Sequence, residues 1–130
     1  MPISFFPRIG QVLVADFSDL KEPEMTKIRP VIIVSPRLPY RSDIVAVVPI
    51  SLTAPKHDLP FCYRLSKNYH PAEMDDLPCW AKADMVTNIA LRRLEGFKVG
   101  RRQWEYPNLS HDDLLGVRRA VLCGLGLDRL

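Results

Sequence analysis

The segment Ile28–Ser35, which reads IRPVIIVS, constrains the fold more than any other part of the chain. Its second half, Val31–Val34, is continuously apolar and mostly β-branched, which is typical of a strand buried on both faces or lying inside a small closed barrel. Proline holds the preceding residue extended and removes a ladder donor, so we expect Arg29 at the strand entrance. A guanidinium held there can bind a phosphate; the alternative is a surface ion pair with Glu22 or Glu24.

Other short strands are predicted on both sides of this segment. Apolar and β-branched residues bounded by turn residues indicate strands at 10–17, 43–51, 61–65 and 79–83. Residues 84–97 are predicted as a short strand followed by a turn of helix that ends at Gly96, and residues 98–103 can add a further strand. Polar loops at 18–27 and 52–60 separate the strands, and the first is long enough to fold over a site.

The C-terminal part predicts one helix. Ser110 followed three residues later by Asp113 resembles a capping box, with Asp in place of the usual Glu. The apolar residues that follow at spacings of three and four are Leu114, Val117, Val121 and Leu125. Five or six short strands and one terminal helix predict a mainly β fold, a strongly bent sheet or barrel capped by the helix, in a single domain of residues 1–130.

The charge of the chain permits a nucleic-acid partner without requiring one. Lys and Arg total 18 against 15 Asp and Glu, which gives a formal net charge of +3 for 130 residues. Residues 1–50, 51–100 and 101–130 each carry one net positive charge by count, so there is no basic tail. A nucleic-acid site would therefore have to be a folded groove.

Cysteine usage and hydropathy predict a reduced, cytoplasmic protein. The three cysteines, Cys62, Cys79 and Cys123, are far apart, and no Cys or His pair has zinc-ligand spacing. We therefore expect free thiols, mostly buried, and no metal or other cofactor. The chain lacks a stretch of about 18 apolar residues, so we expect no membrane span. It also lacks an N-terminal apolar run with a basic flank, which argues against a signal peptide.

Several motifs occur in an order that resembles the PemK/MazF-type toxins. These are the Gly10-opened strand, the acidic loop, Arg29-Pro30-Val31, the strand end Val47–Ser51, Asp84-Met85-Val86, Arg93-Leu94 and the final Leu125-Gly126-Leu127. The resemblance covers about residues 10–127. It implies a small SH3-like barrel of five to six strands with a C-terminal α-helix. It also implies the toxin of a type II toxin–antitoxin pair that cleaves single-stranded RNA at short sequences without a metal.

The same resemblance implies the partners and the site residues. Members are typically homodimers silenced by a cognate antitoxin, and operator DNA is reached only through the toxin–antitoxin complex. Arg29, Ser51 and Glu24 match the catalytic arginine, the catalytic threonine or serine, and an acidic residue of the mobile loop. The residues assigned to RNA binding are Lys27, Thr53, Lys56, Asp84 and Thr87, and the chain departs from the family pattern by lacking an arginine near Thr87.

The residue types fit metal-free RNA cleavage, in which the substrate's 2′-hydroxyl attacks the phosphate. Arg29 can stabilise the charge of the transition state, Ser51 can hydrogen-bond a phosphate oxygen, and Glu24 can accept a proton or simply hold Arg29. By residue type His57 and His70 are candidate general acids, but each lies in a polar loop without a recognisable partner, so surface roles are favoured for both. Trp80 and Tyr63 can stack on bases, although core packing is favoured for Trp80.

Two other functions are compatible with this sequence. Relatives of this fold poison DNA gyrase by protein contact, so the chain could be a non-catalytic binding module. It could also be an inactive toxin retained for binding an antitoxin or operator DNA.

Overall fold

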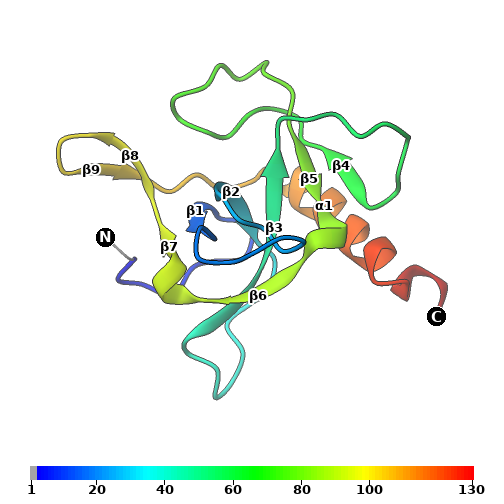
Figure 1. The fold of residues 1–130 in the computed structure, drawn as a ribbon, viewed down its shortest axis with the longest axis horizontal. Helices are drawn as coiled ribbons and strands as arrows, with labels where there is room; N and C mark the ends of the chain where they lie inside the picture. Colours follow the sequence, from blue (N-terminus) through cyan, green and yellow to red (C-terminus); the bar gives the residue numbers. More distant parts are fainter. Residues whose placement is uncertain (1–2) are drawn as a thin grey trace.

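The structure, a computed structural model, describes residues 3–130 and contains one strongly bent sheet, a separate hairpin and one C-terminal α-helix (Figure 1). The elements of the sheet are β1 (Val12–Asp16), β2 (Ile28–Ile33), β3 (Ile44–Ser51), β4 (Cys62–Arg64), β5 (Trp80–Lys82), β6 (Thr87–Ala90) and β7 (Leu94–Glu95). The remaining elements are the hairpin β8 (Phe97–Gly100) and β9 (Gln103–Glu105), the helix α1 (His111–Gly124), and three 3-10 turns, η1 (Ala83–Met85), η2 (Leu91–Arg93) and η3 (Leu127–Arg129).

The sheet is antiparallel and open. Its strand order is β4-β5-β3-β2-β1-β7, and β6 also pairs with β3. The outer edge of β3 is shared, because Ile44–Val47 pair with β6 whereas Ile50 and Ser51 pair with β5. Within residues 3–130 no ladder joins β4 to β7, so the mainly β fold with a terminal helix is confirmed and the closed SH3-like barrel is not.

The central strands bury both of their faces, which is the first of the two alternatives predicted for Val31–Val34. Side chains alternate along each strand. Ile32 and Val48 therefore join Val117 of the helix in one apolar cluster, whereas Val31 and Val47 join a second cluster on the other face. All five of these side chains are fully buried. Since the two clusters share the same strands, a shift of register by one residue would exchange them and disrupt both.

The strand count exceeds the prediction of five to six. Strands β7, β8 and β9 have only two to four residues, and Gly96 and Gly100 interrupt the apolar pattern there. The sequence therefore shows no alternation of apolar and polar residues from which these separate strands could be predicted. The predicted turn of helix before Gly96 is the 3-10 turn η2, after which the chain returns to a strand. The hairpin β8–β9 projects from the body of the molecule (Figure 1).

The C-terminal helix begins where the sequence predicts it. Ser110 is the N-cap, and its hydroxyl accepts a hydrogen bond from the backbone N–H of Asp113. The buried face differs from the predicted stripe, because Asp113, Val117 and Ala120 are buried whereas Leu125 is 55% exposed. The predicted stripe is therefore right in part, because Val117 is buried and Leu114 and Val121 are half-buried. The acidic Asp113, one residue before the stripe, takes a buried position that composition alone assigns to the surface.

Asp113 is the most deeply buried charged residue in the described part of the chain, at 1% exposure. Its carboxylate accepts hydrogen bonds from the hydroxyls of Ser66 (2.6 Å), Tyr69 (2.7 Å) and Tyr63 (2.9 Å), and from the Ser66 N–H at 3.1 Å. Burial by itself would raise the pKa of this carboxyl, but these hydrogen bonds outweigh it and the pKa is lowered. Burial and the neighbouring carboxylate raise the pKa of Tyr63 to about 12.

The three cysteines are free thiols, as predicted, but Cys62 and Cys123 are only half-buried. Cys79 is buried, and burial raises the pKa of its thiol. None of the helices between residues 3 and 130 combines the length and the apolar character needed to cross a bilayer.

Replacing Asp113 by asparagine tests this network. The amide group brings its own N–H donors against hydroxyl donors, so we expect Asp113→Asn to lower the free energy of unfolding by about 3 kcal/mol at pH 7. The lowered pKa means that the stabilisation is complete above the carboxyl's unfolded-state pKa and is lost as the pH falls through the folded-state value. Urea denaturation between pH 7 and pH 3 should therefore show a smaller decline for the variant than for the wild type.

The control for this experiment is Asp112→Asn, an exposed neighbour in the same helical turn. It should change the free energy of unfolding by less than about 0.5 kcal/mol. Equal stabilities of Asp113→Asn and Asp112→Asn would show that the buried network contributes nothing to folding.

Gly116 provides a second test of the packing between helix and sheet. A Cβ atom at this position would clash with the Tyr63 ring, which the hydrogen bond to Asp113 holds in place. We expect Gly116→Ala to destabilise the protein by about 2 kcal/mol, although alanine is the better helix former. In a Tyr63→Ala background the same substitution should stabilise the protein; thermal melts that show the same sign in both backgrounds would refute this account.

Candidate active site

The strand register places Arg29 and Ser51 on adjacent strands. In β2 and β3, Val31 pairs with Pro49, and extending this antiparallel ladder by two residues sets Arg29 opposite Ser51. Residues directly opposite each other point to the same face of a sheet. Pro30, which has no N–H to donate, stands next to Arg29, and the pairing with β3 ends at Val31, whereas the pairing with β1 continues through Pro30 and Arg29 to Ile28. The strand register therefore brings the backbones of the arginine and the serine to the same end of the sheet.

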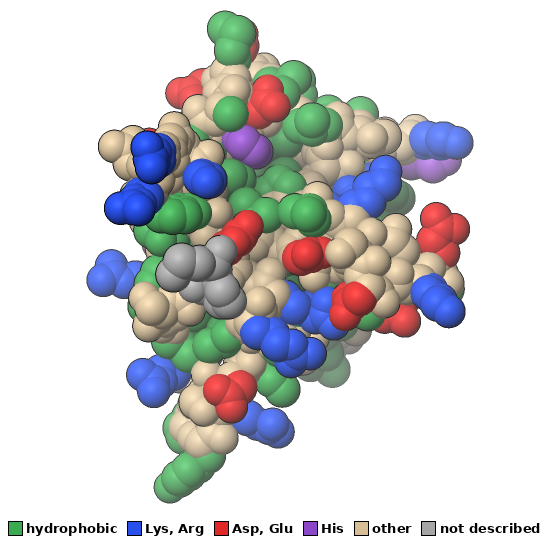
Figure 2. All heavy atoms as spheres, turned by 60° about the vertical axis from the view of Figure 1, so that its left-hand side comes forward, with side chains coloured by type: hydrophobic (Ala, Val, Ile, Leu, Met, Phe, Trp, Pro, Cys, Tyr) green, Lys and Arg blue, Asp and Glu red, His purple; other side chains and the backbone are tan. Residues whose placement is uncertain are grey.

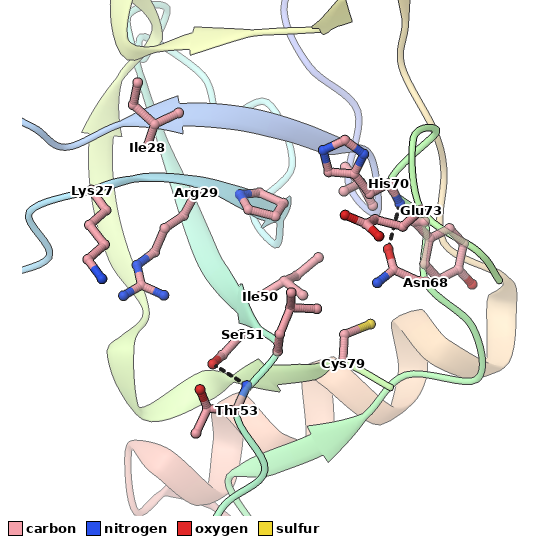
Figure 3. A pocket seen from close by; sticks show the side chains of 14 residues that line it. Lys27, Ile28, Arg29, Ile50, Ser51, Thr53, Asn68, His70, Glu73 and Cys79 are labelled. Carbon is pink, nitrogen blue, oxygen red and sulfur yellow. Dashed lines mark hydrogen bonds between the residues drawn. The ribbon is translucent and has the colours of Figure 1, made fainter. Parts of the chain in front are cut away.

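Both residues line one cleft with a volume of about 380 Å³. The charged and hydrogen-bonding side chains around it include Lys27, Arg29, Ser51, Thr53, His70 and Glu73. In Figure 3, Lys27 and Arg29 occupy one side together with Ser51 and Thr53, whereas His70 and Glu73 lie across the cavity on the 65–79 segment. The size and the mixture of apolar floor and polar walls are typical of a site for a small ligand or part of a polymer.

Arg29 is held partly buried without the partners that its guanidinium usually has. Its Nε is a buried nitrogen with no hydrogen-bond partner in the described part of the protein. The surface ion pair with Glu22 or Glu24 is absent from residues 3–130, because the ion pairs there join Arg93 to Asp19 and Lys67 to Asp75. An unpaired buried donor costs folding free energy. No ion pair within residues 3–130 engages Arg29, so its outer guanidinium nitrogens can bind an anionic ligand.

Ser51 is oriented by a local turn. Its hydroxyl oxygen accepts a hydrogen bond from the backbone N–H of Thr53 at 3.1 Å. The hydroxyl proton is left to donate to another group, and Figure 3 shows this side chain at the edge of the cleft near Arg29. A hydroxyl that is fixed in this way can donate to a phosphate oxygen gripped by the guanidinium.

His70 lines the cleft, although the sequence analysis favoured a surface role for it. Its Nδ1 accepts a hydrogen bond from the backbone N–H of Ala72 at 3.1 Å, so the proton of the neutral ring is on Nε2. The ring packs edge-on against Phe97 with centroids 4.7 Å apart. The prediction of a surface role is wrong for His70, which is half-buried, whereas His57 is exposed as predicted. The signal in the sequence was the neighbouring pair Asn68 and Tyr69, both of which are buried.

The structure separates the other predicted site residues. Lys27 and Thr53 line the cleft with Arg29 and Ser51. Glu24 and Thr87 instead line a different pocket of about 450 Å³, formed by the 18–27 loop and β6. Two predicted residues line neither cavity: Lys56 is exposed on the 52–60 loop, and Asp84 lies in η1, where its backbone approaches Gly124 of the helix.

Charge on the visible face of the molecule is dispersed. Figure 2 shows Lys and Arg side chains spread over this face with acidic side chains among them. Arg93 forms a two-point ion pair with Asp19, in which Nη1 donates to Oδ1 at 2.6 Å and Nη2 donates to Oδ2 at 3.1 Å. This ion pair connects the start of the 18–27 loop to η2. This contact lowers the pKa of Asp19 and raises that of Arg93. Within the cleft, the basic side chains available to a ligand are Lys27 and Arg29.

Comparison with known proteins gives a family match and a shared fold. Residues 8–122 match the model of the PemK-like, MazF-like toxins of type II toxin–antitoxin systems. No curated protein sequence matches the chain significantly.

Among solved structures, the fold is similar to that of MazF from Deinococcus radiodurans, with a TM-score of 0.67 and 21% identity over 95% of this chain and 99% of the other. It is also similar to an endoribonuclease in complex with its cognate antitoxin from a mycobacterial species, with a TM-score of 0.63 and 18% identity over 94% and 97% of the two chains. A MazE–MazF structure from D. radiodurans has a TM-score of 0.62 and 19% sequence identity over 95% of this chain and 99% of the other.

The unpaired Nε of Arg29 leads to a prediction about stability. Arg29→Met keeps the length and apolar stem of the side chain and removes the buried donor, so we expect the free energy of unfolding to rise by about 1 kcal/mol. Urea denaturation of Arg29→Met beside the exposed-helix variant Arg118→Met measures this, and the second variant should change stability by less than about 0.5 kcal/mol. A loss of more than about 1 kcal/mol in Arg29→Met would mean that Arg29 is retained for the fold.

Proposed function

The chain belongs to the family of PemK-like, MazF-like toxins of type II toxin–antitoxin systems, and from this premise we propose that it is a toxin that cleaves single-stranded RNA, including mRNA, at specific short sequences. The observation that carries the proposal is the shared cleft of Arg29 and Ser51, with a guanidinium that has an unpaired buried nitrogen. Similar folds are those of proteins described as endoribonucleases. Residues 1–130 would act as one toxin domain in the cytoplasm.

We propose a reaction that needs no metal ion, because side chains of the cleft can supply the positive charge. The 2′-hydroxyl of the substrate attacks the adjacent phosphorus. Arg29 donates hydrogen bonds to the non-bridging phosphate oxygens as negative charge develops on them, and Ser51 donates one more. Lys27 lies beside Arg29 and adds charge to the same wall (Figure 3).

The RNA-binding residues form an inner and an outer group under this proposal. Lys27 and Thr53 belong to the inner group, since they line the cleft with the catalytic pair. Lys56, Asp84 and Thr87 would contact nucleotides outside the cleft. Contacts of this outer kind would read the bases that flank the cut, because sequence-specific recognition of RNA uses the exposed bases of single strands.

The proposed partners are a cognate antitoxin and a second copy of the chain. Structures with a similar fold include a toxin with its cognate antitoxin and a MazE–MazF complex. Leucines on and after α1 remain solvent-exposed in the single chain, namely Leu115, Leu122, Leu125 and Leu127. Exposed apolar side chains of this number favour contact with another protein. Operator DNA would be bound through the antitoxin complex.

Cleavage of RNA by the purified protein in the presence of a chelator tests the proposal. Arg29→Ala and Ser51→Ala should each lower the cleavage rate by about 100-fold or more, because each removes a donor to the developing charge. The new 3′ ends should carry a cyclic phosphate, which end-mapping and mass spectrometry detect.

The matched control is Arg64→Ala, an exposed arginine on β4 that lies outside the cleft, which should cleave at the wild-type rate. RNA that stays whole with excess wild-type protein would refute the nuclease. Inhibition of gyrase supercoiling by that same protein would then indicate a gyrase poison. Loss of cleavage in Arg64→Ala as well would mean that the site lies elsewhere.

A further inference from the structure

The cleft contains a carboxylate that sequence reasoning did not select. We propose that Glu73, and not Glu24, accepts the proton of the 2′-hydroxyl during RNA cleavage. This inference rests on the proposed function and adds the general base to it. Glu73 lines the cleft of Arg29 and Ser51, whereas Glu24 lines the separate pocket beside β6. Figure 3 shows the Glu73 side chain on the wall that faces Arg29 across the cavity.

The segment that carries Glu73 is held rigidly by buried polar groups. Asn68 is 5% exposed; its Oδ1 accepts from the His70 N–H at 2.9 Å, and its backbone N–H donates to the Asp75 carbonyl at 2.9 Å. The Glu73 N–H donates to the His70 carbonyl at 3.0 Å, which closes a turn. A base must be positioned before its pKa matters, and these contacts fix the backbone that carries Glu73 at the cleft independently of any substrate.

The other titratable group on this wall, His70, is unsuited to accept the proton. Its Nδ1 already accepts the Ala72 N–H, so its Nε2 carries a hydrogen and can only donate toward the cleft. Protonating the ring would set two donors against each other at Nδ1. His70 can donate to a substrate oxygen or to the Glu73 carboxylate, and the carboxylate of Glu73 is left as the acceptor on this wall.

The Glu73 carboxylate has no hydrogen bond or ion pair with any residue from 3 to 130, so both of its oxygens are available. The charged or titratable groups around it come from both sides. Lys27, Arg29 and His70 share the cleft, and Lys67, Asp75 and Glu105 line an adjoining cavity that also includes Glu73. Lys67 is 3.9 Å from Asp75, so its charge is partly compensated there.

The proposed step balances with water as the only co-reactant. The 2′-oxygen forms a bond to phosphorus as its proton passes to the Glu73 carboxylate. The bond from phosphorus to the 5′-oxygen breaks, its electron pair leaves with that oxygen, and the oxygen takes a proton from water. The products are a 2′,3′-cyclic phosphate and a 5′-hydroxyl, and Glu73 returns its proton to solvent.

Kinetics of Glu73→Gln on a single-stranded RNA that the wild type cuts test the assignment. We expect kcat to fall by about 100-fold or more, with loss of the limb of the pH profile in which kcat/KM rises with pH. Binding of the same sequence with 2′-deoxyribose at the cut should be unchanged or tighter, because a negative charge is removed. Asp76→Asn, an exposed acid of the same segment, is the matched control and should keep the wild-type rate and profile.

Three results separate the possible failures. If the wild type cuts RNA, Arg29→Ala does not, and Glu73→Gln keeps the wild-type pH profile, the inference fails and the proposed function stands. If Glu24→Gln rather than Glu73→Gln loses the rising limb, Glu24 is the base and the inference fails. If the wild type leaves RNA whole, the proposed function fails and the inference fails with it.

Discussion

The buried carboxylate of Asp113 is the interaction on which the rest of the structure depends. It lies in the first turn of α1, and it accepts hydrogen bonds from Tyr63 of β4 and from Ser66 and Tyr69 of the 65–79 segment. Tyr69 also lines the cleft, and its hydroxyl accepts the N–H of Ser110, the helix cap. One charged group therefore joins the helix, the edge of the sheet and one wall of the cleft. The carboxylate can be buried at 1% exposure only because these hydrogen-bond donors compensate for the water that it loses on folding.

The two walls of the cleft are stabilised by different interactions. The wall with Arg29 and Ser51 belongs to the central ladder of β2 and β3, whose side chains are buried on both faces. The wall with His70 and Glu73 belongs to an irregular segment, which Asn68 holds by hydrogen bonds to its backbone. The cleft thus combines a rigid sheet with a segment whose shape depends on polar contacts. The unpaired Nε of Arg29 is a cost that the surrounding core can offset.

Sequence reasoning succeeded where a strong local rule applies. The β-branched run after Pro30 predicted a central strand, and the apolar segments at 10–17 and 43–51 predicted its two neighbours, because buried strands need such side chains. Ser110 predicted the start of the helix through its cap. The further strand predicted at 98–103 is in fact a hairpin, because β8 and β9 are too short to show a periodicity that separates them. The burial of Asp113 was not predicted, because burial of a charge depends on donors from distant segments.

The residues of the candidate site also fall into two groups, those whose positions local sequence rules predict and those whose positions depend on tertiary contacts. The sequence by itself determined that Arg29 stands at a strand entrance and that Ser51 ends a strand, since proline and β-branched residues restrict the backbone locally. Only the tertiary structure decided which residues share the cleft. It brought His70 and Glu73 to Arg29 and put Glu24 and Thr87 in another pocket. The physical reason is that loop positions depend on contacts between segments far apart in the chain, and no local pattern encodes such contacts.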